Sequence, residues 1–249
     1  MDPLSGGAEG VFPGGGIRFR LAIVGGSDLS VGAYMSTTAE TSTGGHRAFI
    51  SERLGSLLAI APLGLWVLVH LWHNLGALWG PAAWQEAVTE YPNNGAMLLS
   101  AVVVLTPLVL HTIWGIRRIL IARPNNVRYG FFGNFKYLLQ RLSAVGVLLF
   151  LAAHIWLAFL EPRILEGHPE SFADFSHEMR HNIPTLPVYL LGTLGVAYHL
   201  ANGVYTFSMS WGLSVSRASL KAFERFSIVL FVVLLGMSWA SIFAVWSAG

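Results

Sequence analysis

The sequence has 249 residues, of which 54% are hydrophobic and only 11% are charged, and its formal net charge is +2. Ordinary soluble domains contain about 25% charged residues, so this composition indicates an integral membrane protein. The small net charge gives no reason to expect nucleic acid as a partner. Cysteine is absent, which excludes disulfides, thiolate-held iron–sulfur clusters and covalent C-x-x-C-H haem attachment from this chain.

The first 44 residues are rich in glycine, serine and threonine. Their one apolar patch, residues 21–24, is too short for the core of a signal peptide. We expect residues 1–44 to form a disordered extension and residues 45–249 to form the membrane domain. Met35, which begins MSTTAETSTGG, is a candidate for the true start of the protein.

Five apolar segments follow the extension, and each is long enough to cross a bilayer as a helix at about 1.5 Å per residue. Each segment matches one gap in the charged residues, because no Asp, Glu, Lys or Arg occurs between residues 53 and 86, 90 and 117, 141 and 161, or 180 and 217, or after residue 225. The sequence therefore predicts an all-α fold, an integral membrane bundle of five transmembrane helices. The expected spans cover approximately residues 54–77, 96–121, 138–160, 186–212 and 226–247.

The charged residues between the spans predict the orientation of the bundle. Most Lys and Arg residues fall on one side, which we expect to be cytoplasmic, and only Arg163 and Arg180 fall on the other. The second side instead carries acidic residues, among them Glu86, Glu90 and Glu161. Five spans then place the N-terminus in the cytoplasm and the C-terminus outside.

Each of the first four spans contains one deeply placed histidine: His70, His111, His154 and His199. An ionisable residue in an apolar segment is costly unless it has a partner, so it indicates a functional site. The distances to the span ends place His70 and His154 in the outer half of the membrane and His111 in the inner half. His199 lies near the middle and pairs with His111 by elimination. A lone membrane histidine more often bonds a neighbouring helix or relays protons, but a set on four consecutive helices favours metal ligation.

Two pairs of neutral imidazoles at two depths match the requirement of two stacked b-type haems. Each haem iron takes one axial nitrogen from each of two facing helices, so we expect the first four helices to enclose both haems. Small residues allow a planar group to approach a helix closely, although glycine is common in membrane helices for other reasons. The available glycines are Gly64, Gly115, Gly146, Gly192, Gly195 and Gly203.

Four stretches, each with one of these histidines, carry a family resemblance. They read FISERLGSLLAIAPLGLWVLVHLWHN, LTPLVLHTIWGI, NFKYLLQRLSAVGVLLFLAAHIW and YHLANGVYTFSMSWGLSVS. In this order they resemble the five-helix dihaem cytochrome b anchor of bacterial succinate:menaquinone oxidoreductases, the cytochrome b558 type, over most of residues 48–247. The resemblance implies two haem b groups: an outer, lower-potential one held by His70 and His154, and an inner, higher-potential one held by His111 and His199.

The resemblance also implies the setting of the protein. It would be a multi-pass subunit of respiratory complex II, the succinate dehydrogenase of the tricarboxylic acid cycle, in the bacterial cytoplasmic (inner) membrane. A flavoprotein subunit and an iron–sulfur subunit would dock on its cytoplasmic face, and the succinate-oxidising site would lie on those partners. Electrons would pass through both haems to menaquinone near the outer surface, or in reverse for fumarate reduction, and the complex could form a higher oligomer.

Three residues near the outer surface are candidate proton donors for the quinone: His73, Glu86 and Glu90. His73 lies three residues beyond His70, about one helical turn nearer that surface. The alternative interpretation of His73 is an interfacial histidine in the aromatic belt beside Trp72. For the two glutamates the alternative is a solvated loop carboxylate.

Three further residues, Arg53, Gln140 and Arg141, lie at inner helix ends and are candidate partners of haem propionates. Arginines at this depth also contact lipid phosphate. Two other functions stay open at this point. A dihaem anchor of another quinone-linked oxidoreductase would also need paired histidines, with a different helix order. A haem-free proton-coupled transporter would use membrane histidines as a relay, usually with an internal repeat, which we do not find in this sequence.

Overall fold

The computed structural model describes residues 9–11, 18–20, 43–90, 94–121 and 130–249. The chain divides into two units, Met1–Phe49 and Ile50–Gly249. In the first unit, strands β1 (Glu9–Val11) and β2 (Arg18–Arg20) pair in antiparallel fashion. Most of the expected extension over residues 1–44 lies outside the described residues, so its disorder stays a prediction.

The second unit consists of helices over its described residues, as the sequence predicts. Its first part is a continuous helical path: α1 (Thr43–Leu58), which begins in the first unit, the π-helix η1 (Ala59–Gly64), α2 (Leu65–Asn74) and the 3-10 helix η2 (Leu75–Trp79). The other long helices are α4 (Asn94–Ile121), α5 (Phe132–Ile155), α7 (Thr185–Ser210) and α8 (Arg217–Ala248). The short ones are α3 (Pro81–Val88), α6 (Phe172–His181) and the π-helices η3 (Trp156–Leu160) and η4 (Pro162–Glu166), which follow α5.

Among the described residues, four helical stretches are long and apolar enough to cross a membrane: Arg53–Trp79, Asn94–Ile121, Phe132–Glu166 and Arg217–Ala248. A fifth candidate span consists of α6 and α7 taken together across a bend of 100°. The expected spans 54–77, 96–121, 138–160 and 226–247 each lie within one of the four stretches. The expected span 186–212 falls on α7, which ends at Ser210.

Local sequence explains several helix boundaries. Pro62 lies inside η1, where the missing N–H of proline suits a widened helical turn. Helix α8 starts at a capping box, in which the Ser216 hydroxyl accepts from the Ser219 N–H and the Ser219 hydroxyl accepts from the Ser216 N–H, both at 3.0 Å. These two bonds satisfy N–H groups that the first turn of a helix leaves without partners.

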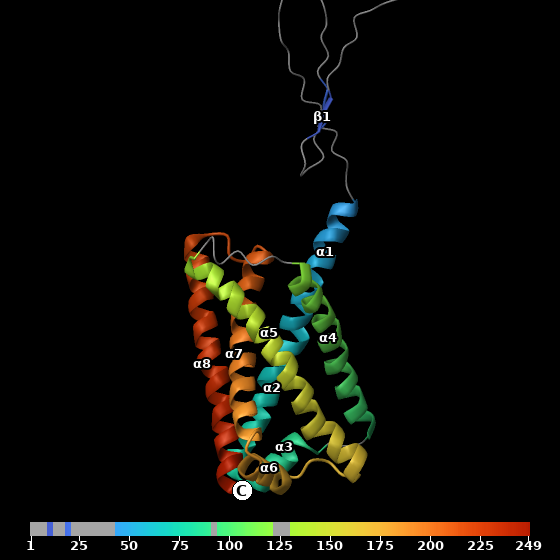
Figure 1. Ribbon diagram of the computed structural model, residues 1–249, viewed down its shortest axis with the longest axis vertical. Helices are drawn as coiled ribbons and strands as arrows, with labels where there is room; N and C mark the ends of the chain where they lie inside the picture. Colours follow the sequence, from blue (N-terminus) through green and yellow to red (C-terminus); the bar gives the residue numbers. More distant parts are fainter. Residues whose placement is uncertain (1–8, 12–17, 21–42, 91–93, 122–129) are drawn as a thin grey trace, which may run out of the picture. The chain divides into compact units, whose positions relative to one another are not determined.

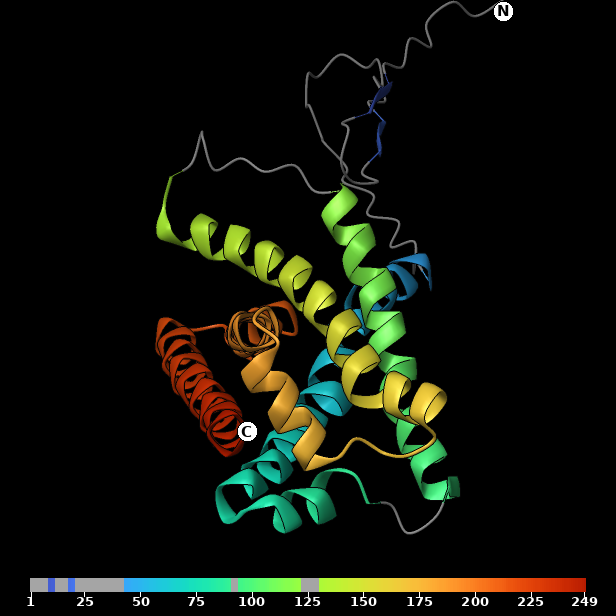
Figure 2. The ribbon, with the colours of Figure 1, turned by 60° about the horizontal axis from the view of Figure 1, so that its bottom comes forward.

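The short helices α3 and α6 do not belong to the expected spans, yet each has a start signal. Helix α3 begins at Pro81, the favoured first position for proline, after Gly80 with a φ of 112°. Helix α6 begins after Ser171, whose hydroxyl accepts from the Asp174 N–H at 3.0 Å. Both helices lie with η2 and the end of α8 at one end of the bundle (Figures 1 and 2), which we call the capped end.

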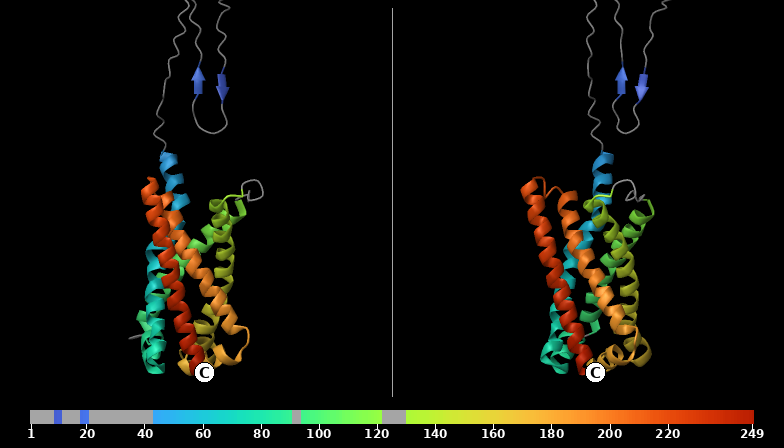
Figure 3. Two further views of the ribbon diagram at one scale, coloured as in Figure 1. Left: turned by 90° about the vertical axis from the view of Figure 1, so that its left-hand side faces the viewer. Right: turned by 60° about the vertical axis from the view of Figure 1, so that its left-hand side comes forward.

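The opposite end is where α4 finishes and where α5 and α8 begin (Figures 1 and 3). We call it the basic end, because these helix ends carry Arg117, Arg118, Lys136 and Arg217. The Lys136 ammonium pairs there with the carboxylate of Glu224 on α8.

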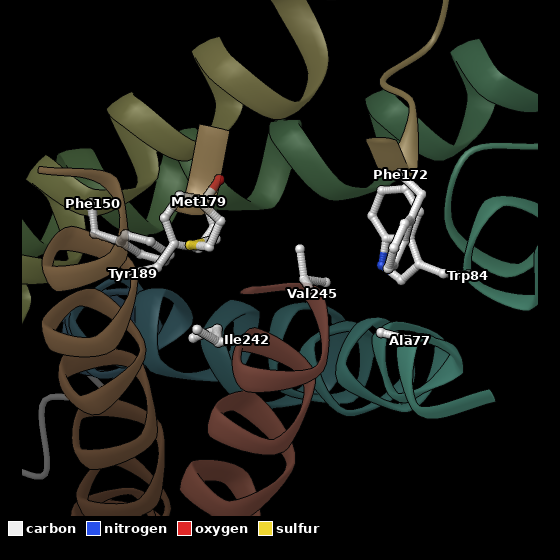
Figure 4. Close-up of a cluster of buried hydrophobic side chains, with 8 residues drawn as sticks. All are labelled: Ala77, Trp84, Phe150, Phe172, Met179, Tyr189, Ile242 and Val245. Atoms are coloured by element: carbon white, nitrogen blue, oxygen red, sulfur yellow. The ribbon is translucent and has the colours of Figure 1, made fainter. Parts of the chain in front are cut away.

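The hydrophobic core gathers near the capped end, where side chains from several helices meet (Figure 4). In contrast, α2 has no buried residue, α4 has only Pro107 and α5 has only Phe150. The helices that carry His70, His111 and His154 therefore bury few side chains against protein. The core cluster contains Ala77, Trp84, Phe150, Phe172, Met179, Tyr189, Ile242 and Val245.

Gly192 is the point where α5 and α7 approach closely. A Cβ at this position would lie 2.2 Å from Cγ of Phe150, so Gly192→Ala forces the phenyl ring to move. We expect the variant to lose about 1–3 kcal/mol of stability, the usual cost of overpacking. The measurement is thermal unfolding of the purified protein in detergent, followed by circular dichroism.

Gly195→Ala is the matched control, one turn further along α7. Its Cβ would lie 3.6 Å from Cγ2 of Val147, which is ordinary contact, and alanine favours the helix by about 1 kcal/mol. Equal unfolding temperatures for the two variants would contradict the close approach at Gly192.

Candidate functional site

His70 on α2 and His154 on α5 face each other across the bundle. Their ring centroids are 5.9 Å apart and the ring planes meet at 70°. Each ring also stacks on an aromatic residue four positions earlier in its own helix. The centroid of Trp66 lies 4.6 Å from that of His70, and the centroid of Phe150 lies 5.5 Å from that of His154. These stacking contacts hold both imidazoles in fixed orientations.

His111 on α4 and His199 on α7 form a second pair. Their ring centroids are 6.2 Å apart with the planes at 66°. The structure thus brings together the same two pairs that the depth argument selects. Iron ligation by these residues stays a prediction.

The spacing within each pair suits two ligands on opposite sides of one metal. With metal–nitrogen bonds of about 2.0 Å, two such imidazoles have their ring centroids about 6 Å apart. Over the described ranges, no three His, Cys, Asp or Glu side chains converge as a metal site. Each pair offers two nitrogen donors, which is the number of axial ligands that a haem iron takes.

The Nδ1 atoms of three of these histidines have hydrogen-bonding partners. His111 Nδ1 lies 2.9 Å from the carbonyl oxygen of Gly55 and donates to it. His154 Nδ1 lies 3.1 Å from the hydroxyl of Tyr189. A partner on Nδ1 fixes the tautomer of a metal-binding histidine and leaves Nε2 for the metal.

His199 completes this pattern through α5. Its Nδ1 lies 3.3 Å from the Ser143 hydroxyl, which itself donates to the Gln140 carbonyl oxygen at 3.0 Å. Ser143 can therefore accept from the His199 Nδ1–H, and the Gln140 amide nitrogen also lies 3.3 Å from this Nδ1. The Gln140 amide donates to the His199 carbonyl oxygen at 3.0 Å and accepts from Asn202 at 2.7 Å. Gln140 thus contacts the polypeptide around His199.

His70 differs, because its contact involves Nε2. The Asn74 amide nitrogen lies 3.4 Å from His70 Nε2 and donates to the His70 carbonyl oxygen at 2.8 Å. The indole N–H of Trp84 on α3 donates to the Asn74 side-chain oxygen at 3.2 Å. One hydrogen-bonded chain therefore connects α3 at the capped end to His70.

The glycines on these helices divide into packed and open positions. A Cβ at Gly192 would meet Phe150, and one at Gly64 would lie 3.2 Å from the Leu200 side chain. A Cβ at Gly115 on α4 or Gly146 on α5 would meet nothing within 4 Å. The pair spacing and the Nδ1 partners of His111, His154 and His199 fit the requirements of haem.

The candidate propionate partners all contact protein atoms. Arg53 Nε donates to the Ser210 carbonyl oxygen at 2.8 Å, at the end of α7. Arg141 donates to the Tyr137 hydroxyl at 2.5 Å and its guanidinium lies 4.3 Å from the Tyr137 ring centroid. The third candidate, Gln140, contacts His199 and Asn202 on α7.

His73 lies at the capped end and lines a pocket of about 170 Å³. Glu86 and Glu90 are exposed and do not contribute to its lining. The pocket is formed by the end of α2, η2 and α3, through Trp72, His73, Leu75, Gly76, Trp79 and Ala87.

Glu170 is an ionisable residue at the capped end that the sequence analysis did not single out. Its backbone is tied to α3, because Gln85 Nε2 donates to the Glu170 carbonyl oxygen at 3.0 Å. Burial, together with the nearby carboxylates of Asp174 and Glu166, raises the pKa of its carboxyl group to about 7. Such a group titrates near neutral pH.

The sequence is similar to known membrane subunits. A family model described as the succinate dehydrogenase/fumarate reductase transmembrane subunit matches residues 132–236. The succinate dehydrogenase cytochrome b558 subunit of Bacillus subtilis (strain 168) is 29% identical over 207 residues, which cover 80% of this chain and 98% of that protein.

The chain is therefore a helical membrane protein with several apolar spans. Within that class it is similar to the succinate dehydrogenase/fumarate reductase transmembrane subunits. This confirms the resemblance found in the histidine-bearing stretches.

The raised pKa of Glu170 gives stability a definite pH dependence. The folded chain binds this proton more tightly than the unfolded chain, whose pKa is 4.5, so stability falls as the pH rises from about 4.5 to about 7. Glu170→Gln should flatten this part of the profile, raising the unfolding temperature at pH 8 and leaving it unchanged at low pH. Thermal unfolding at pH 4.5 and pH 8 measures the effect.

The groups that act on Glu170 besides Asp174 and Glu166 are Glu161, which also raises its pKa, and His168, which lowers it. Glu86→Gln, at an exposed site on α3, is the control. An unfolding temperature at pH 8 that rises equally in both variants would contradict a specific effect of Glu170.

Proposed function

We propose that the chain is the dihaem cytochrome b subunit of a bacterial succinate:menaquinone oxidoreductase. The observation that carries this proposal is the presence of two facing imidazole pairs on four different helices, 5.9 Å and 6.2 Å between ring centroids. His70 and His154 would hold the outer haem b, and His111 and His199 the inner one. When bound, each haem supplies a reversible one-electron couple.

The remaining residues of the site orient and tune these ligands. The Gly55 carbonyl, Ser143 and Tyr189 hold Nδ1 atoms, which fixes the tautomer and makes the imidazole a stronger electron donor. Arg53 and Arg141 place positive charge near the basic end, where propionates need cations. The contacts of Gln140 favour support of His199 over direct contact with a propionate.

The proposed direction of the bundle follows from its charges. The basic end would face the cytoplasm, in accord with the positive-inside rule, with the C-terminus outside. A flavoprotein subunit and an iron–sulfur subunit would dock at that end and carry the succinate site. Electrons would enter at the His111–His199 pair, leave at the His70–His154 pair and reduce menaquinone, or follow the reverse order during fumarate reduction.

The pocket at His73 is the proposed quinone site. It lies at the capped end, about one helical turn beyond His70. Trp72 and Trp79 provide flat apolar walls for a quinone ring. His73 is exposed and would donate a proton to a quinone oxygen. Glu86 and Glu90, on and just beyond α3, would exchange protons between His73 and water.

Two alternatives differ in observable ways. A dihaem anchor of another quinone-linked oxidoreductase would also carry two haems, but it would copurify with different catalytic subunits. A haem-free proton-coupled transporter would be colourless. A reduced-minus-oxidised spectrum and a haem-to-protein ratio, followed by an assay of succinate-dependent quinone reduction in the intact complex, separate the three functions.

His70 provides a test of the proposed haem ligands. His70→Ala should remove the outer haem and spare the inner one, because His111 and His199 lie on other helices. Haem content per chain should fall by half, with one b-type spectrum left. Retention of both haems in this variant would rule out the proposed ligand assignment.

His73 provides a test of the proposed quinone site. His73→Leu should keep both haems and slow quinone reduction by at least about tenfold, since loss of a general acid usually costs more than this. The control is His177→Gln, at an exposed histidine on α6 that lies outside the pocket lining. Unchanged quinone reduction in the His73 variant would remove His73 from the site.

A further inference from the structure

Tyr189 combines an apolar location with a single polar contact. The side chain is 4% exposed, and its ring centroid lies 5.4 Å from those of both Phe150 and Phe175 (Figure 4 shows Phe150). Its hydroxyl lies 3.1 Å from Nδ1 of His154. Among the described residues, this is the hydroxyl's one hydrogen bond. A buried tyrosine hydroxyl requires such a partner, so the contact fixes both side chains.

The direction of this hydrogen bond follows from the chemistry of a neutral imidazole. One ring nitrogen carries hydrogen and the other offers a lone pair. If Nε2 of His154 binds iron, Nδ1 carries the hydrogen and donates to the Tyr189 oxygen. The bond then increases electron donation from the imidazole to the metal. Greater donation stabilises the oxidised, more positively charged iron and lowers its reduction potential.

Helix α6 holds Tyr189 in place through the bend that precedes it. The Glu178 carboxylate accepts from the Asn182 side chain at 2.6 Å and from the Thr185 hydroxyl at 3.0 Å. Met179, also on α6, is almost fully buried and belongs to the same core cluster as Tyr189 (Figure 4). These contacts fix the start of α7 relative to α6, and Tyr189 follows in the second turn.

Gln85 then fixes α6 relative to α3. Its side-chain oxygen accepts from the Phe172 N–H at 2.9 Å, and its amide donates to the Glu170 carbonyl oxygen at 3.0 Å. The ring of Trp84, next to Gln85, stacks on Phe175 at 5.9 Å. The whole capped end therefore supports the position of the Tyr189 hydroxyl.

We infer that Tyr189 is a positioning residue that orients His154 and lowers the reduction potential of the haem bound by His154, while α6 keeps the tyrosine in register. This inference rests on the proposed function, because it requires a haem between His70 and His154. It goes beyond that function by assigning the control of one haem's potential to one hydroxyl group.

The test is a potentiometric titration of both haems in the intact complex carrying Tyr189→Phe. Phenylalanine keeps the ring and removes only the oxygen. We expect the ferric-to-ferrous equilibrium of the outer haem to shift by up to about tenfold toward the reduced form, which is a rise of about 59 mV for one electron. The inner haem, identified as the one retained in His70→Ala, should keep its potential.

Tyr198→Phe is the matched control. Tyr198 stands on the same helix, and its hydroxyl donates to the Lys136 carbonyl oxygen at 3.3 Å instead of contacting a histidine. Its loss should leave both potentials unchanged. An unchanged outer potential in Tyr189→Phe, or an equal shift in Tyr198→Phe, would overturn the inference.

Tyr189→Met provides a second variant if the first does not assemble, because methionine fills irregular space without a hydroxyl. It must raise the same potential, and failure to do so also overturns the inference. Failure of the proposed function is distinguishable, because it shows in the unaltered complex as fewer than two haems per chain. Two haems with unmoved potentials would leave that function intact and remove only the role of Tyr189.

Discussion

The organising constraint of this protein is the placement of imidazole groups inside apolar helices. A nitrogen atom taken out of water costs free energy unless it finds a partner. Each of the four deep histidines satisfies this requirement on one side with a protein contact: Gly55, Asn74, Ser143 or Tyr189. The ring centroids of His70 and His154 lie 5.9 Å apart, and those of His111 and His199 lie 6.2 Å apart. The rings of Trp66 and Phe150, which stack on His70 and His154, agree with this arrangement.

Charge supplies the second level of organisation. Lys and Arg gather at the helix ends opposite α3 and α6, while Glu166, Glu170 and Asp174 lie between η4 and the first turn of α6. Under the proposed function, this asymmetry gives the electron path its direction, because the basic end would face the cytoplasm. It also explains why an acid with a pKa near 7 occurs at the capped end, where several carboxylates share a half-buried region.

Much of the fold was predictable, because a membrane limits a chain to helices of a known minimum length. The stretches without charged residues located the spans, and depth along each span was enough to pair His70 with His154 and His111 with His199. The depth of a residue along a span does not show which way its side chain points around the helix axis. The contacts of Ser143 and Tyr189, and of Gln140 with the His199 carbonyl, therefore could not be read from spacing. Helices α3 and α6 were missed because apolar length was the criterion, although Pro81 and Ser171 are ordinary start signals.

The sparse packing of α4 has a consequence for how the protein is made. This helix has one buried residue, Pro107, and a glycine that faces open space. With so few packing contacts to other helices, α4 is only weakly held in one position after insertion. Under the proposed function, the porphyrin is the missing neighbour, so maturation of the subunit should depend on the supply of pigment in the cell.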